Sequence, residues 1–207
     1  MDSSEGGEGL SGSRGALLGI GALVVAAVVL VALSVRRPEL PVYAPSPILA
    51  AGAADSTPPG TTRLLTIDAS DPERWRHVDL ARGTLVENPG ARGWDLAFRR
   101  FEVRVNGGAG AGADVGVADL GELPLDSVRA LPTEGYAGMQ AEGRDTTQVL
   151  LDDWYSYSFT SHVLRPKART YAVRTVDGRR AALAFVSYYC PGAQPGCVTL
   201  RYRFLDP

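Results

Sequence analysis

The sequence has few of the side chains that bind metal ions or attack substrates. Its 207 residues include only two cysteines and two histidines, and these lack the close spacing of zinc ligands. It has no GxSxG motif of a hydrolase, and Ser161 and His162 are neighbours that point to opposite faces in an extended strand. The 21 basic and 23 acidic residues leave a net charge of -2, without the basic excess of nucleic-acid-binding proteins. We therefore expect no metal site, no nucleic-acid partner and no enzymatic activity.

Aromatic residues are almost missing from the N-terminal part of the chain. Only Tyr43 precedes residue 61, so the packed core is expected in residues 61–207. Residues 1–14 form a polar tail, and residues 36–60 hold six prolines among alanine, glycine and serine. That composition is typical of an extended spacer. The sequence thus predicts a tail, an apolar segment at 15–35, a proline-rich linker and one folded domain.

Charged residues are absent from Gly15 to Val35, a run of 21 residues. As a helix with a rise of 1.5 Å per residue, this run is about 32 Å long, close to the roughly 30 Å core of a bilayer. A cleavable signal peptide is the alternative, but its apolar region usually has only about 7–15 residues. Residue 36 has no cysteine nearby that could be acylated in a lipoprotein. We therefore expect a single-pass transmembrane helix that is not cleaved.

Small residues recur along one side of this segment. Gly15, Gly19, Ala22 and Ala26 follow helical spacing, and the first two form a GxxxG motif. Such a stripe lets a second helix approach closely, although glycine and alanine are also common in membrane helices without that role. The stripe indicates packing against the helix of a membrane protein.

The two cysteines bear on the topology. Cys190 and Cys197 enclose a short proline- and glycine-containing loop between apolar runs, which favours a hairpin closed by a disulfide over two buried thiols. The bond would stabilise the fold by about 2–3 kcal/mol and needs an oxidising compartment. The arginines around the apolar segment weakly favour the opposite orientation. We expect a protein of the bacterial inner membrane whose C-terminal domain lies in the periplasm.

Residues 61–207 alternate between apolar and polar side chains with a period of two. The alternation is clearest in 198–204, and Asp177-Gly178 between two apolar runs is a strong hairpin signal. The alternation changes phase at Arg99-Arg100, which predicts a bulge or bend. A short helix is expected at 125–130. Strands are expected at 63–67, 74–80, 94–105, 115–120, 154–160, 170–176, 181–189 and 198–204. The predicted fold is all-β and antiparallel, either a sandwich or a strongly curved sheet.

Three further segments are candidates for ligand binding. The alternating residues Tyr155, Tyr157 and Phe159 share one face of a strand, which indicates either core packing or an aromatic binding surface. Met139 and His162 are side chains of the type that coordinates haem iron axially. The glycine-rich stretch 106–112 opens no helix, so a hairpin connection is favoured over a nucleotide-binding loop.

The order of several short motifs resembles one known family. These motifs are WDLAFRRF at 94–101, NGG at 106–108, WYxY at 154–157, HxxxP at 162–166, YxVRTxDG at 171–178 and FxSYY at 185–189. Together they resemble the HmuY-like family over residues 62–205. The resemblance implies an exported all-β domain, and its best-known members are surface lipoproteins that capture haem between two axial His or Met side chains. Here the resemblance leaves His162 and Met139 as the candidate haem ligands, with a membrane helix in place of the lipid anchor.

Three functions remain open on these grounds. The first is an accessory or structural subunit on the periplasmic face of a larger membrane complex, such as a respiratory or photosynthetic electron-transfer assembly. Its partners would be membrane proteins and the lipid bilayer, and it would need no cofactor. The second is haem binding through His162 and Met139. The third is an adhesion or surface-binding module. The small-residue stripe and the long linker favour the first.

Overall fold

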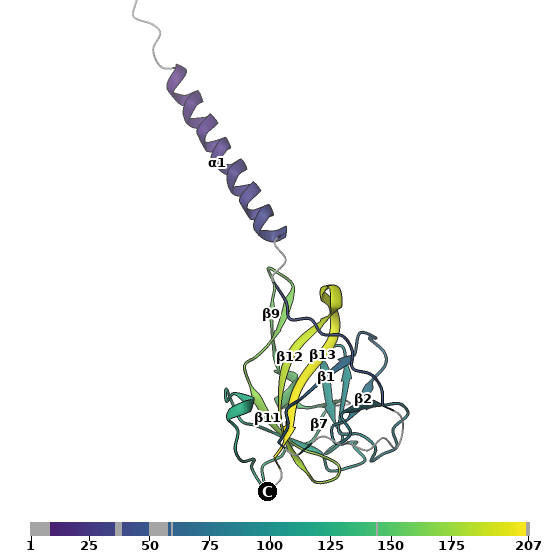
Figure 1. The fold of residues 1–207 in the computed structure, drawn as a ribbon. Helices are drawn as coiled ribbons and strands as arrows, with labels where there is room; N and C mark the ends of the chain where they lie inside the picture. The colour runs from purple at the N-terminus through teal and green to yellow at the C-terminus, as the bar shows by residue number, and fades with distance from the viewer. Residues whose placement is uncertain (1–8, 36–38, 50–57, 59, 144, 206–207) are drawn as a thin grey trace, which may run out of the picture. The chain divides into compact units, whose positions relative to one another are not determined.

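A computed structural model describes residues 9–35, 39–49, 58, 60–143 and 145–205 of the chain. The chain divides into two compact units, residues 1–39 and 40–207. The first contains helix α1, Gly9–Val35. The second is the β domain (Figure 1).

The elements of the β domain are short except for the last two strands. In chain order they are β1 Arg63–Asp68, β2 Arg76–Asp79, β3 Thr84–Val86, β4 Leu96–Arg99, β5 Glu102–Val105, β6 Gly116–Asp119, η1 Leu125–Ser127, β7 Gln140–Glu142, β8 Asp145–Thr147, α2 Val149–Asp152, β9 Tyr155–Ser158, β10 Val163–Pro166, β11 Thr170–Arg174, β12 Arg180–Cys190, η2 Pro191–Ala193 and β13 Gln194–Phe204.

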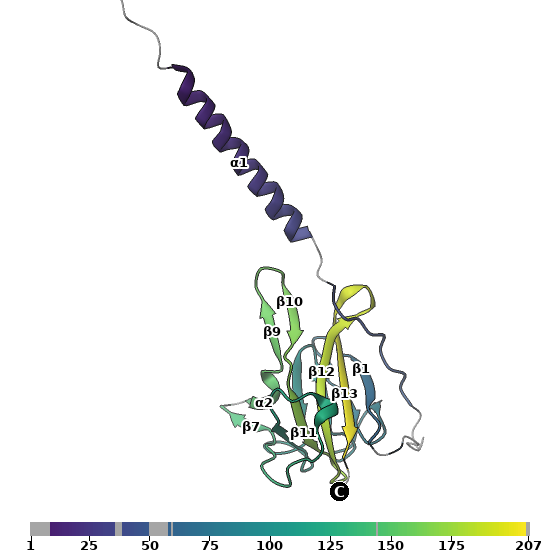
Figure 2. The same cartoon turned by 60° about the vertical axis from the view of Figure 1, so that its left-hand side comes forward.

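The larger sheet has five antiparallel strands in the order β1-β13-β12-β11-β6. The hairpin predicted at Asp177-Gly178 joins β11 to β12, and Gly178 has the positive φ of 83° that such a turn requires. Strands β12 and β13 extend past their neighbours to a tip at residues 190–197, which is visible in Figures 1 and 2. The strong two-residue period of the sequence therefore marks the central strands correctly.

The smaller sheet has four antiparallel strands in the order β3-β2-β4-β5. The phase change at residues 99–100 is a complete reversal of the chain, because β4 and β5 pair with each other with Arg99 opposite Glu102. Arg100 has a φ of 54° in the turn. A tight turn and a bulge both invert the alternation of side chains, so the sequence pattern fits either one.

One apolar core joins the two sheets. Its buried side chains come from strands of both, and Trp154 is its largest fully buried member. The Trp154 ring stacks on Phe185 with centroids 4.4 Å apart, and its Nε1 donates to the Phe101 carbonyl at 2.8 Å. The buried indole thus has the hydrogen-bond partner that it needs away from water. The all-β antiparallel fold is confirmed.

The prediction for the N-terminal apolar segment needs correction. A helix that crosses a bilayer core needs about 20 consecutive apolar residues. Within the ranges that the structure describes, no helix has the length and hydropathy to cross a membrane. A transmembrane helix at 15–35 is therefore not supported, and the localisation inferred from it, a single-pass inner-membrane protein with a periplasmic domain, is wrong.

The linker also differs from a free spacer in the part that the structure describes. Residues 40–49 run along the β domain and are called the strap below. Tyr43 N donates to the Tyr189 carbonyl at 3.2 Å, and Ser46 Oγ accepts from Thr66 N at 2.9 Å. Farther along, Leu49 N donates to Thr84 Oγ1 at 2.8 Å. These bonds tie the strap to both sheets.

Candidate binding surfaces

The hairpin of β9 and β10 carries an exposed aromatic tip. The two strands form a sheet of their own, and their tip lies at the same end of the domain as the tip of β12 and β13 (Figure 2). Phe159 is 83% exposed and Tyr157 is 44% exposed, with their ring centroids 5.3 Å apart. Ser161 Oγ donates to Ser158 Oγ at 2.8 Å across the turn. The predicted aromatic segment is thus divided: Trp154 lies in the core, and Tyr157 and Phe159 lie on the surface.

His162 closes this turn in a left-handed backbone conformation, with a φ of 54°. Its Nδ1 lies 2.8 Å from the Tyr157 hydroxyl, within hydrogen-bond distance. When Nδ1 donates to that hydroxyl, Nε2 is left as the basic nitrogen, the form in which histidine binds a metal. His162 thus has the chemistry of a ligand at an exposed position.

Met139 lies in the core and not beside His162. It is only 6% exposed, its peptide N donates to the Gly107 carbonyl at 2.6 Å, and its Sδ accepts from Val105 N at 3.4 Å. A sulfur atom that is buried and already engaged cannot reach an iron atom at an exposed hairpin. The structure therefore does not bring the predicted pair of haem ligands together.

A haem group needs both an axial ligand and an apolar surface for its ring. His162 offers the first, and Tyr157 with Phe159 offers a small area of the second. The described residues thus fit coordination by one histidine at an exposed tip. They do not fit a site in which His162 and Met139 hold the iron from opposite sides.

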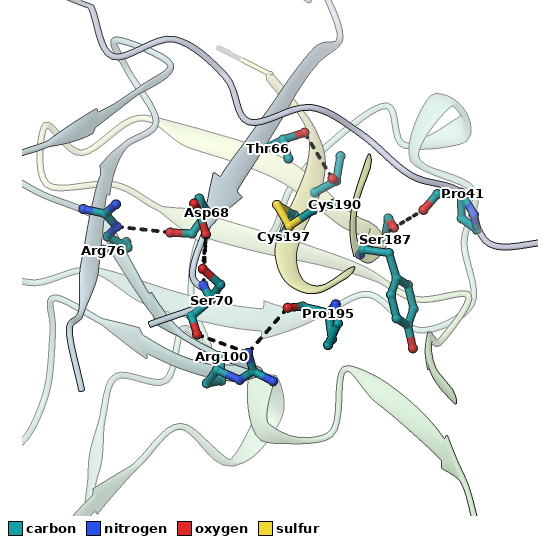
Figure 3. Close-up of a disulfide and its surroundings, with 12 residues drawn as sticks. Pro41, Thr66, Asp68, Ser70, Arg76, Arg100, Ser187, Cys190, Pro195 and Cys197 are labelled. Atoms are coloured by element: carbon teal, nitrogen blue, oxygen red, sulfur yellow. Dashed lines mark hydrogen bonds between the residues drawn. A yellow bond between two sulfur atoms is a disulfide. The ribbon is translucent and has the colours of Figure 1, made fainter. Parts of the chain in front are cut away.

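The predicted disulfide is present and fastens the tip of β12 and β13 (Figure 3). Cys190 and Cys197 are bonded to each other, with Cα atoms 4.9 Å apart. A carboxylate oxygen of Asp68 and the two sulfur atoms all lie within 4.8 Å of one another. Because both sulfur atoms are used in the bond, this group does not supply the thiolates of a zinc site.

The glycine-rich loop is a packed structural element and not a flexible connection. Buried Asn106 holds it, because Nδ2 donates to the Ala91 and Trp94 carbonyls and Oδ1 accepts from Gly112 N at 3.1 Å. A Cβ on Gly107 would lie 1.8 Å from the Val115 carbonyl oxygen. Close backbone packing thus explains the glycine there, and the loop forms no phosphate cradle.

An aromatic and basic face on the smaller sheet was not expected from the sequence. The guanidinium carbons of Arg99 and Arg104 lie 4.7 and 4.3 Å from the centre of the Trp75 ring. A cleft of about 290 Å³ adjoins this group and is also lined by Tyr155. Arg99 pairs with Glu102, its opposite residue in the β4–β5 hairpin. The only signal in the sequence was the phase change that brings these residues onto one face.

Helix α1 exposes apolar side chains around its whole circumference. Nine large ones between Leu18 and Val31 are 49–76% exposed. Of the predicted small-residue stripe, Gly19, Ala22 and Ala26 are exposed on the helix, while the exposure of Gly15 lies outside what the structure describes. Added atoms at Gly19 would meet nothing within 4 Å. A helix that is apolar on all sides is normally covered by other apolar groups.

The sequence and the fold have recognisable relatives. The sequence pattern of the HmuY protein family matches residues 71–202. No curated protein matches the sequence. Two solved structures are similar over most of their length. The apo HmuY analogue of Tannerella forsythia is 18% identical, with 74% of this chain and 100% of that chain covered and a TM-score of 0.55. A predicted HmuY-like haem-binding protein of Bacteroides vulgatus is also 18% identical, with 70% and 93% covered and a TM-score of 0.55.

A third similar structure has the same fold. It is a predicted lipoprotein of Bacteroides fragilis, 18% identical, with 70% of this chain and 90% of that chain covered and a TM-score of 0.55. At this identity the likeness shows the fold alone. The match of the family pattern to well over half of the chain carries the assignment: the chain belongs to the HmuY family.

Proposed function

We propose that this protein is a non-enzymatic accessory subunit that docks onto a larger membrane protein complex. The exposed apolar surface of α1 carries this proposal. Burying a valine or leucine side chain gains about 1.5–3 kcal/mol, so a helix with nine large exposed apolar side chains favours association strongly. The small residues Gly19, Ala22 and Ala26 leave room for a partner helix to approach closely.

The β domain supports a binding role rather than catalysis. Its two histidines lie apart, one in the exposed turn and the other half-buried against the Trp94 ring at 4.8 Å. Its cysteines are joined in a disulfide, so neither is a nucleophile. Respiratory and photosynthetic electron-transfer assemblies are the class of partner that we propose for such a subunit.

The test is the size and composition of the native particle. The full chain, tagged at its C-terminus, is extracted in mild detergent and run on a native gel. We expect it to migrate with a stoichiometric set of membrane proteins, and pigment absorption bands would mark an electron-transfer complex. Val24→Arg with Val28→Arg should release it, because two charges on an apolar contact are costly. Leu123→Ser, on the β domain, is the matched control. A wild-type chain that migrates alone overturns the proposal.

Haem binding is a second candidate, favoured by the hydrogen bond between Tyr157 and His162 Nδ1. The B. vulgatus protein named above is a predicted haem-binding protein. Here the single ligand would be His162 Nε2. Titration of the full chain with haem should then give a sharp Soret band that His162→Ala removes and His77→Ala keeps. The spectrum of free haem throughout would eliminate this candidate.

A further inference from the structure

We infer that one end of the β domain is a second docking surface for the same protein that covers α1. This end consists of the β9–β10 turn at 157–162, the disulfide-closed loop at 190–197 and the start of the strap at 40–43, and it is called the entry end below. The inference rests on the proposed function, because it concerns the same partner. It adds a contact through the folded domain.

The first residues of the strap are bonded to β12 at this end of the domain. Ser187 Oγ donates to the Pro41 carbonyl (Figure 3). Val42 forms a parallel bridge with Tyr189. Tyr189 in turn contacts the other hairpin, because its hydroxyl accepts from Leu164 N at 2.9 Å. The strap, β12 and β10 are therefore joined directly where the chain enters the domain.

The covalent chain limits the distance from this end to α1. The helix ends at Val35 and the domain begins at Leu40, five residues later. A fully extended chain spans at most about 3.5 Å per residue, so these two positions lie within about 18 Å of each other in any arrangement. A protein that covers the last turns of α1 is therefore within reach of the entry end.

Formal charge is missing from all the segments that meet there. Residues 40–49, 155–164 and 181–200 contain no Asp, Glu, Lys or Arg, in a chain of which 21% is charged. Charged side chains lie beside these segments: Asp68 is next to the disulfide, exposed Glu39 precedes the strap, and the Arg100 guanidinium donates to the Ser70 and Pro195 carbonyls. Depletion of charge at the centre of a surface and enrichment in aromatic residues are typical of protein interfaces. The three segments of the entry end have both features, with the charged side chains beside them.

Phe159 is the anchor that this surface offers. It is the most exposed large apolar side chain of the β domain among the described residues, at 83%. The ring of Tyr157 packs against it, and the hydroxyls of Ser158, Thr160 and Ser161 are bonded within the turn. A rigid turn with one aromatic residue at its tip loses little conformational entropy on binding. Its polar, uncharged neighbours suit hydrogen bonding with a protein partner rather than insertion into lipid.

Site-specific photo-crosslinking tests the inference in the full chain within its own cells. Benzoylphenylalanine replaces Phe159, Val24 in α1 or Leu123 in three separate variants, and mass spectrometry identifies the adducts. Leu123 is a suitable control because it is 50% exposed and lies away from the entry end. Its carbonyl accepts from Thr170, which pairs with Ala184 of β12, and Ala184 is six residues from Cys190. Along a strand that separation is about 20 Å.

We expect positions 24 and 159 to crosslink to the same polypeptide, and position 123 to give no such adduct. A protein adduct at 24 together with none, a different protein or only lipid at 159 overturns the inference and leaves the proposed function standing. If position 24 gives no protein adduct, the proposed function is overturned, and the inference of a shared partner is overturned with it. An adduct at 123 equal to that at 159 also overturns the inference, because contact would not be confined to the entry end.

Replacing the Phe159 side chain gives an independent test on the purified complex. Phe159→Ser should speed dissociation of the purified complex by about tenfold or more, as loss of an interfacial aromatic anchor does. Leu123→Ser should leave the rate unchanged. Because Phe159 is largely exposed, the unfolding midpoint should not change between the two variants. Equal dissociation rates for Phe159→Ser and wild type overturn the inference.

Discussion

Asp95 is a buried carboxyl group whose charge should make the stability of the fold depend on pH. It is 3% exposed, and its two oxygens accept from Leu80 N and Val176 N, each at 2.8 Å. Through these bonds it links β2 to the β11–β12 hairpin. Burial raises the pKa of Asp95 from 3.8 to about 6, with the two backbone N–H groups opposing the rise and the charges of Asp79 and Asp177 adding to it.

The direction of the effect follows from proton binding. Between pH 4 and 6 the folded protein holds a proton on Asp95 that the unfolded chain has released. The contribution of Asp95 to the free energy of unfolding is therefore fully present below about pH 4 and is lost as the pH rises through 6. A pKa of about 6 in the folded protein against 3.8 in the unfolded chain corresponds to about 3 kcal/mol. His77 acts in the opposite sense, because burial lowers its pKa and protonation then favours the unfolded chain.

The substitution Asp95→Asn separates the effect of the Asp95 charge on stability from the effect of its two hydrogen bonds. The amide has no charge to bury, so the loss of stability with rising pH should disappear. Its single acceptor oxygen leaves one of the two N–H donors without a partner, which costs about 1–3 kcal/mol at every pH. The variant should therefore be less stable than wild type at pH 4 and close to it at pH 7.

Equilibrium unfolding in guanidinium chloride, followed by tryptophan fluorescence at pH 4 to 7, measures this directly on the full chain in mild detergent. The informative quantity is the difference in unfolding free energy between wild type and Asp95→Asn, in which the contribution of His77 cancels. That difference should fall by about 3 kcal/mol from pH 4 to 7. A constant difference, or one that rises, would refute the assignment of a raised pKa to Asp95.

Other substitutions test the remaining structural claims. Replacing Cys190 and Cys197 together by serine opens a loop of eight residues and should cost about 2.5 kcal/mol in denaturant unfolding, and no measurable loss would contradict it. Trp154→Ala should cost about 3–5 kcal/mol with a large fall in fluorescence, whereas an exposed tryptophan would cost little. Gly107→Ala should lower stability by about 1–3 kcal/mol or more, since its Cβ meets a carbonyl oxygen, while Gly90→Ala, with nothing within 4 Å, should lower it far less.

The regular strands could be predicted because their signal is local. Alternation over 198–204 and the Asp177-Gly178 turn correspond to β13 and to the β11–β12 connection. The short strands β3, β7, β8 and β10 were missed, since three or four residues give too few alternations to recognise. The turn at Arg100 was located but not identified, because bulges and tight turns change the alternation in the same way.

The candidate haem ligands show that residue type alone does not predict which side chains lie together in the fold. Met139 and His162 have suitable donor atoms, but Met139 is enclosed by Val105 and Gly107 from a distant part of the chain. The strap gives a second example. Its proline content predicts an extended chain, and only hydrogen bonds with β1, β3 and β12 decide that it is bound to the domain.

The β class, the disulfide, the family and the absence of charge from three separate segments could all be recognised in the amino-acid sequence. That those segments meet at one end of the domain, and that Met139 is buried, is visible only in the folded chain. The reason is that periodicity and composition act between neighbours in the chain, whereas burial and hydrogen bonding depend on distant residues. Ser187 and Pro41 are 146 positions apart, and the bond between them exists only once the sheets have formed.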